Sequence, residues 1–130
     1  MKRKVNLIPM AGRGKRFKNA GYELPKPLID IYGKPMFVRA VESLPKADKI
    51  IFVCLKQHIK KFKIDKIIKS YFPKSIVITS RKKKLGQAAD SLEASRYLKK
   101  NDNLTIGACD NGMVYDLKAL KNKTQKADLV

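Results

Sequence analysis

Four short apolar runs, separated by segments of helical length, constrain the fold of this chain more than any other feature. They cover residues 5–9, 49–55, 75–79 and 104–108. Each run is continuously apolar rather than alternating, which is typical of strands buried on both faces of a parallel sheet. The sequence therefore predicts an α/β fold with a Rossmann-like, mainly parallel sheet and helices on both faces.

The segments between and after these runs predict four helices. The first should span about 36–44, because proline precedes it and suits the first turn of a helix. Apolar residues spaced as on one helix face predict a single amphipathic helix over 57–71, with a basic outer face. A third helix is expected over 87–99 and a short fourth one around 116–121. The packed stripe of the third helix should consist of Ala88, Leu92, Ser95 and Leu98.

The chain has a large excess of positive charge, with 30 Lys and Arg residues against 11 Asp and Glu and a formal net charge of +19. However, 24 of the basic residues are Lys and only six are Arg, whereas proteins that read base edges favour the planar guanidinium group. Apart from the run at 81–84, the lysines are dispersed. We therefore expect that nucleic acid is not the main partner. A non-catalytic domain that binds RNA or another polyanion stays open as an alternative.

No apolar run approaches the roughly 20 residues that a membrane-spanning helix needs, and no signal-peptide core follows the basic N-terminus. We therefore expect a cytoplasmic protein without a membrane span. Cys54 and Cys109 lie inside apolar, strand-like segments and lack the spacing of metal ligands. They are interpreted as reduced core residues.

Residues 1–130 contain no internal repeat and no low-complexity linker, so a single domain is expected. Residues 127–130 resemble the beginning of a fifth strand that follows the short helix. We therefore expect residues 1–130 to be the N-terminal, nucleotide-binding part of a domain that is incomplete at its C-terminus.

The segment after the first apolar run combines glycines with positive charge. Gly12 and Gly14 would let the backbone approach a phosphate group closely, and three basic side chains surround them. The segment is not a Walker loop, and Phe17 occupies the position of the third glycine in a dinucleotide-binding motif. Taken alone, the two glycines are equally consistent with a tight turn.

Four segments of the chain resemble, in order, the conserved segments of the sugar-nucleotide pyrophosphorylase family. They are LIPMAGRGKRF at 7–17, LPKPLIDIYGKPM at 24–36, LGQAADSLEA at 85–94 and LTIGACDNG at 104–112. The first two are the specific ones, since they match the family's AGxGxRF/L loop followed by PKxL and GKP. The resemblance extends to about residue 116 and corresponds to the N-terminal half of a typical member. Pro9 and Met10 depart from the pattern, because many members have Leu-Ala or Gly there.

The resemblance implies a Mg²⁺-dependent nucleotidyltransferase that converts a nucleoside triphosphate and a sugar 1-phosphate into an NDP-sugar and pyrophosphate. The match is nearest to enzymes of bacterial capsule and surface-polysaccharide synthesis. A cytidylyltransferase acting on a non-sugar phosphate such as phosphocholine has a similar loop and lysine, so it stays open as an alternative. The resemblance leaves open whether the protein forms a homo-oligomer.

The resemblance also assigns roles to residues of the first two segments. Arg16 would hold the β- and γ-phosphates as a bidentate donor, and Lys26 would bridge the α-phosphate and the incoming phosphate. Two flanking prolines restrict the backbone of Lys26 and thereby the direction of its ammonium group. The loop residues implied to bind the nucleotide are Ala11, Gly12, Arg13, Gly14 and Lys15.

Two later segments complete the predicted site. Asp110 should emerge at the carboxyl end of the fourth strand, where a carboxylate among basic groups suits Mg²⁺; it could also cap the Asn-Gly turn that follows. Gly86 and Gln87 open a helix where the family reads its nucleobase, so they are the expected base contacts. Asp116 is interpreted as a helix N-cap, and His58 is assigned no catalytic role.

Overall fold

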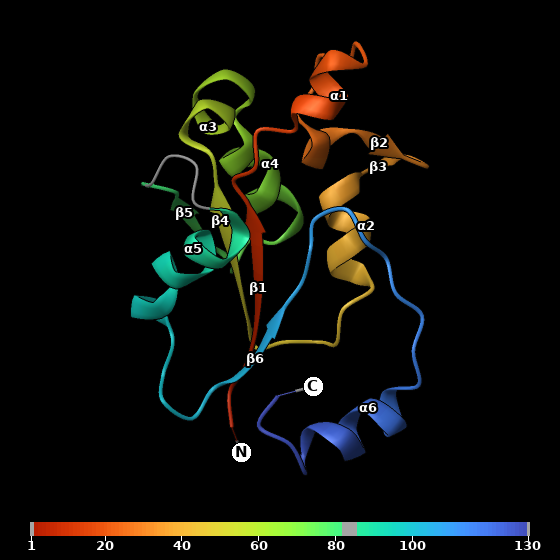
Figure 1. Ribbon diagram of the computed structural model, residues 1–130, viewed down its shortest axis with the longest axis vertical. Helices are drawn as coiled ribbons and strands as arrows, with labels where there is room; N and C mark the ends of the chain where they lie inside the picture. Colours follow the sequence, from red (N-terminus) through yellow and green to blue (C-terminus); the bar gives the residue numbers. More distant parts are fainter. Residues whose placement is uncertain (1, 82–85, 130) are drawn as a thin grey trace.

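The computed structural model describes residues 2–81 and 86–129 and contains a four-stranded parallel sheet (Figure 1). Its strands are β1 (Lys4–Met10), β4 (Lys49–Cys54), β5 (Ile76–Thr79) and β6 (Asn103–Ile106). They lie in the order β5-β4-β1-β6, and every neighbouring pair is parallel. The predicted α/β fold is therefore confirmed, and each strand begins within one residue of its predicted position.

Strand β1 lies inside the sheet and carries core residues on both faces. It pairs with β4 from Val5 to Met10 and with β6 from Lys4 to Leu7. Because side chains alternate along a strand, Ile8 and Met10 enter one core cluster, whereas Val5 and Leu7 enter the other. All four side chains are almost completely buried, as expected for a strand covered on both sides.

Three helices cover the first face of the sheet: α2 (Met36–Glu42), α3 (Lys56–Phe62) and α4 (Ile64–Tyr71). Helix α2 packs Phe37 edge-on against Phe52 of β4, with ring centroids 5.8 Å apart. The predicted single helix over 57–71 is wrong. The chain turns at Lys63, which has a left-handed φ of 54°, and this residue ends α3 and precedes α4. The backbone N–H of Lys63 donates the last hydrogen bond of α3, to Ile59 O at 3.1 Å, and the left-handed conformation of Lys63 then redirects the chain into α4.

The second face is covered by α5 (Gly86–Glu93) and the 3-10 turn η2 (Ser95–Tyr97). The predicted stripe of this helix is wrong for Leu92, which is 72% exposed, and for Ala88 and Ser95, which are exposed as well, whereas Leu98 packs against this core as predicted. The buried residues are instead Asp90, whose carboxylate accepts a 2.7 Å hydrogen bond from Ser80 Oγ, and Ala94. The helix was predicted to reach residue 99 but ends before residue 95, so the predicted apolar residues do not all lie on one helix.

The segment between β1 and α2 holds elements that the sequence did not predict. They are α1 (Lys15–Asn19), the 3-10 turn η1 (Lys26–Leu28) and a hairpin of β2 (Asp30–Ile31) and β3 (Lys34–Pro35). In Figure 1 the strand arrows point toward the end of the molecule that carries α1 and this hairpin. The carboxyl ends of the parallel strands therefore face these elements.

Strand β6 forms one border of the sheet, and its predicted burial on both faces is wrong. Leu104 is 41% exposed and Ile106 is 57% exposed. Their register with Val5 and Leu7 places them on the same face of the sheet as α5. Because α5 packs against β1 and β4, the side chains of Leu104 and Ile106 stay exposed.

The end of the chain forms α6 (Leu117–Thr124), which Asp116 caps as predicted by accepting from Lys118 N at 2.8 Å. Residues 127–129 form no strand, and residue 130 lies outside the described residues. Across the described ranges 2–81 and 86–129, no helix is long and apolar enough to cross a membrane.

Candidate active site

The loop after β1 exposes the predicted glycines and basic side chains. Ala11 is buried, whereas Gly12, Arg13, Lys15 and Arg16 are exposed. A Cβ atom added at Gly12 would meet nothing within 4 Å, so the backbone there is open to an approaching group. The loop can therefore present both bare backbone and positive charge to a phosphate chain.

Gly14 links this loop to α1 and requires a backbone that favours glycine. It precedes the helix with φ 59° and ψ 38°, in the left-handed region. A Cβ atom at Gly14 would lie 3.7 Å from Lys26 Cβ, which is ordinary contact. The second predicted segment thus lies directly beside the first.

Lys26 is held by a rigid local backbone and by an aromatic ring. It begins the turn η1 between Pro25 and Pro27, and Pro27 is buried. Its Nζ atom lies 5.0 Å from the centroid of the Phe17 ring, an attractive cation–π arrangement. Phe17 in turn packs against Tyr22 at 5.3 Å between centroids. The contact of Phe17 with Lys26 was not predicted, because a motif pattern does not show the path of the intervening loop.

Asp110 follows β6 and forms an ion pair with Lys26. The bond joins Lys26 Nζ to Asp110 Oδ2, and the side chains are 26% and 29% exposed. The sequence predicted Asp110 at the carboxyl edge and assigned Lys26 to the site by resemblance, and the structure brings them together across 84 residues of chain. A cation and a carboxylate beside an open glycine loop can bind a phosphate chain and a metal ion, respectively.

The fit of this site to Mg²⁺ depends on the number of carboxylates. In the ranges 2–81 and 86–129, no group of three or more His, Cys, Asp or Glu residues could hold a metal ion. The candidate ligand that the predicted site offers is Asp110, whose side chain is part-exposed. That donor set fits Mg²⁺, which is commonly bound by one or two carboxylates together with substrate phosphates.

The expected base contacts begin α5, after the carboxyl end of β5. Gly86 has a left-handed φ of 80°, and Gln87 is exposed. Among the described residues, no hydrogen bond joins the Gln87 side chain to Lys26 or Asp110. Residues 82–84 of the basic run at 81–84 lie outside the described residues.

The cysteines and the histidine are buried among apolar residues. Burial raises the pKa of Cys54 to about 12 and that of Cys109 to about 11, so both thiols are protonated near neutral pH. Both are free, which confirms their interpretation as reduced core residues. Burial also lowers the pKa of His58, whose ring packs 6.2 Å from that of Phe62.

The geometry above agrees with one family of enzymes. A family model of the MobA-like NTP transferase domain matches residues 7–121. The chain belongs to this family. The predicted nucleotidyltransferase assignment is thereby confirmed at the level of the MobA-like NTP transferase family. The search of curated proteins found no match.

Solved structures share the fold of this MobA-like domain. HddC from Yersinia pseudotuberculosis complexed with GMP-PN is 25% identical, with a TM-score of 0.74, and the match covers 97% of this chain and 56% of HddC. A putative glucose-1-phosphate thymidylyltransferase from Bacillus anthracis is 18% identical, with a TM-score of 0.79 and coverages of 96% and 51%. The inositol-1-phosphate CTP transferase from T. maritima is 18% identical, with a TM-score of 0.73 and coverages of 94% and 48%. The chain thus spans about half the length of these structures.

Proposed function

We propose that this chain is the nucleotide-binding part of an enzyme that transfers a nucleoside monophosphate from an NTP to a sugar 1-phosphate. The products are pyrophosphate and an NDP-sugar, and the NDP-sugar is used for capsule or surface-polysaccharide synthesis. The observation that carries the proposal is the Lys26–Asp110 pair beside the open Gly12–Gly14 loop. It gathers the groups that a triphosphate and its metal ion require at the carboxyl edge of a parallel sheet, where such folds bind ligands.

The reaction joins an oxygen of the sugar phosphate to the α-phosphorus and breaks the bond from that phosphorus to the bridging oxygen of pyrophosphate. Pyrophosphate leaves with the bonding electron pair. Catalysis of such a step is mainly positioning and charge stabilisation. Arg16 holds the β- and γ-phosphates, and Lys26 holds the α-phosphate beside the incoming phosphate, with Phe17 beneath the ammonium group.

In this proposal, Asp110 supplies one ligand to Mg²⁺, and the triphosphate oxygens supply others. When bound, the metal ion neutralises the negative charge that gathers on the phosphates. The ammonium group of Lys26 must then exchange its carboxylate partner for phosphate oxygens. Gly86 and Gln87 are proposed as contacts of the nucleobase, at the beginning of α5.

The acceptor is proposed to be a sugar 1-phosphate. The name of the B. anthracis structure refers to glucose 1-phosphate, which supports that class of acceptor. Since the chain spans about half of these relatives, we propose that residues 1–130 bind the nucleotide. The acceptor pocket and a second carboxylate are proposed to belong to the other half of the enzyme.

A second candidate is a cytidylyltransferase with a non-sugar acceptor. It is favoured by the fold shared with the T. maritima enzyme, whose name refers to inositol 1-phosphate and CTP. The same lysine and glycine loop would serve both reactions, so the acceptor and the nucleobase distinguish them.

The experiment titrates the chain with GTP, CTP, UTP and dTTP in the presence of Mg²⁺ and follows the backbone amide signals by NMR. We expect one nucleotide to shift the signals of Gly12 and Gly14, and Arg16→Ala to weaken its binding. Lys60→Ala on α3, which removes an exposed cation elsewhere, is the matched control. Pyrophosphate release from the preferred NTP with a panel of sugar 1-phosphates, inositol 1-phosphate and phosphocholine then identifies the acceptor. If no NTP shifts the glycine signals, the proposal is wrong.

A further inference from the structure

The parallel sheet also gathers its strand starts, at the edge opposite the proposed nucleotide site. Residues 2–4, 48–49, 74–75 and 99–103 meet there and are called the amino edge below. Backbone hydrogen bonds fix the neighbours, since Asp48 N donates to Lys4 O at 2.9 Å and Asn103 N donates to Arg3 O at 2.8 Å. Lys49 Nζ donates to Lys74 O at 3.2 Å.

The amino edge has a surplus of positive charge that its own carboxylates do not offset. Its two acidic residues are Asp48 and Asp102. Asp102 is held by Arg3, whose Nε and Nη2 donate to the two carboxylate oxygens at 3.0 and 2.6 Å, and Asp48 accepts from Lys4 N at 2.8 Å. The basic residues of the edge are Lys2, Arg3, Lys4, Lys49, Lys74, Lys99 and Lys100.

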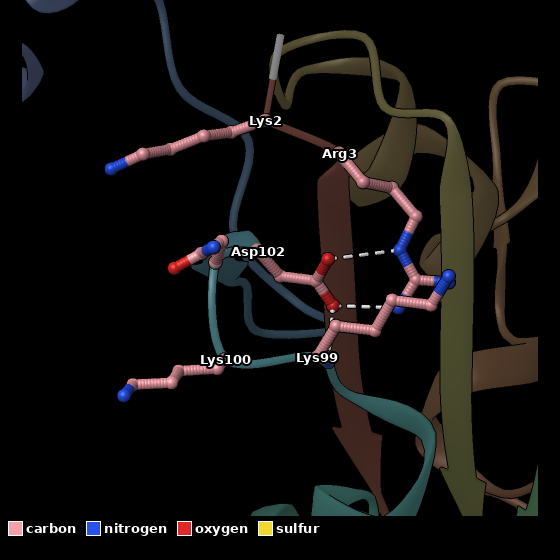
Figure 2. A pocket seen from close by; sticks show the side chains of 6 residues that line it. Lys2, Arg3, Lys99, Lys100 and Asp102 are labelled. Atoms are coloured by element: carbon pink, nitrogen blue, oxygen red, sulfur yellow. Dashed lines mark hydrogen bonds and ion pairs between the residues drawn. The ribbon is translucent and has the colours of Figure 1, made fainter.

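An open cavity of about 660 Å³ lies at one end of this edge. It is lined by Lys2, Arg3, Lys99, Lys100, Asn101 and Asp102. Figure 2 shows the side chains of Lys2 and Lys100 extending to the same side, away from the Arg3–Asp102 pair. In the described part of the chain, neither lysine forms an ion pair, so their ammonium groups are available to an anion.

We propose that the amino edge binds a linear chain of phosphoryl groups. Lys2 and Lys100 hold one end of the chain at the cavity, and the other lysines of the amino edge add positive charge around it. Charges interact over roughly 8–10 Å at physiological salt, so a longer chain of phosphoryl groups reaches more of this positive charge than a single phosphate does.

The chemistry of the edge favours a phosphate chain over a nucleic acid. Lysine binds phosphate as a compact charge, whereas reading or stacking on bases needs free guanidinium or aromatic groups. Arg3 is committed to Asp102 and to Tyr97 O, and the Tyr97 ring lies 5.1 Å from the Arg96 guanidinium. RNA is accordingly an outcome of the test and not the proposed ligand. This inference is independent of the proposed nucleotidyltransferase activity, because it concerns the opposite edge of the sheet.

The test measures binding of tripolyphosphate and of a longer polyphosphate by calorimetry, with NMR to locate the shifted amides. We expect the longer chain to bind more tightly and to shift residues 99–103. The double variant Lys2→Gln/Lys100→Gln should weaken its binding at least about tenfold, the loss typical of one hydrogen bond to a charged group. Lys60→Gln/Lys66→Gln, on α3 and α4, is the matched control with the same loss of charge and should bind normally.

Three results would overturn the inference. Shifts confined to residues 11–26 would mean that polyphosphate binds only at the proposed nucleotide site. Equal weakening of polyphosphate binding in both double variants would mean that the binding depends on net charge alone. Tighter binding of a single-stranded RNA with the same number of phosphates would mean that the edge recognises nucleic acid. A failure of NTP binding would leave this result unaffected, so the two proposals fail separately.

Discussion

Replacing Lys26 by methionine should strengthen the binding of a divalent cation in the absence of nucleotide and weaken the binding of NTP. Without nucleotide, the ammonium group occupies the carboxylate of Asp110, so a divalent cation must displace it. Methionine keeps the length of the side chain and its packing against Phe17 but removes the competing charge. We therefore expect Lys26→Met to bind a divalent cation more tightly than the wild-type chain does.

The magnitude follows from the exposure of the pair. Both side chains are about one-quarter exposed, and an ion pair of this kind is worth up to about 1 kcal/mol. Relief of the repulsion between the ammonium group and a dication about 4 Å away adds roughly 2 kcal/mol at the dielectric constant of water, less in salt. Together these terms predict an increase in metal affinity of about fivefold to a hundredfold. With NTP bound, the variant loses a charged hydrogen bond to phosphate, so NTP affinity should fall at least about tenfold.

The assay is a titration with Mn²⁺ followed by paramagnetic broadening of the amide signals of Asp110 and Asn111. Asp110→Asn should abolish the broadening, and Lys60→Met should titrate like the wild type. If Lys26→Met binds Mn²⁺ no more tightly than the wild type, the ion pair does not compete with metal. If the variant binds NTP normally, Lys26 is not a phosphate contact.

Three further variants test a close contact in the core, an ion pair and a left-handed residue. Gly107→Ala should lose about 1–3 kcal/mol in urea unfolding, because its Cβ would lie 2.6 Å from Leu44 Cδ1, while Gly112→Ala, with open space around it, should change little. The Arg3 hydrogen bond lowers the pKa of Asp102 from 3.8 to about 2, and the carboxylate stabilises the fold only while it is ionised. Asp102→Asn should therefore remove the part of the acid destabilisation that falls between about pH 4 and pH 2, which a pH series of unfolding curves checks. Lys63→Gly should gain about 0.5–1 kcal/mol in thermal unfolding, because glycine adopts the left-handed φ of 54° without strain, and a loss of stability would contradict this reasoning.

The strands were predictable because burial on both faces leaves a continuous apolar run. β1 and β4 keep the predicted character, and Ile8 of β1 is fully buried, whereas β5, at the other border of the sheet, has only Ile78 buried. The exposure of Leu104 and Ile106 was not predictable, since an apolar run does not show whether a strand lies inside a sheet or at its border. The break at Lys63 also left no signal, because the usual marker of a left-handed residue is glycine or asparagine.

The site was predictable in its location but not in its contacts. Asp110 could be placed at the carboxyl edge because residues that follow strands of a parallel sheet meet there, and the family resemblance assigned Lys26 to the same site. Their ion pair depends on the path of the loops after β1 and β6, and local sequence does not determine that path. The contact of Phe17 with Lys26 escaped prediction for the same reason.

The central position of β1 also determines the order in which the domain can form during synthesis. β1 is made first, but its register joins Lys4 to Asn103, so one of its two sides stays unpaired until β6 has been made. At about 5–20 residues per second, synthesis of the intervening chain takes roughly 5–20 seconds. During that interval an apolar strand offers free backbone donors and acceptors to other chains. Slower translation between β4 and β6 should therefore lower the yield of folded protein, whereas slower translation after β6 should not.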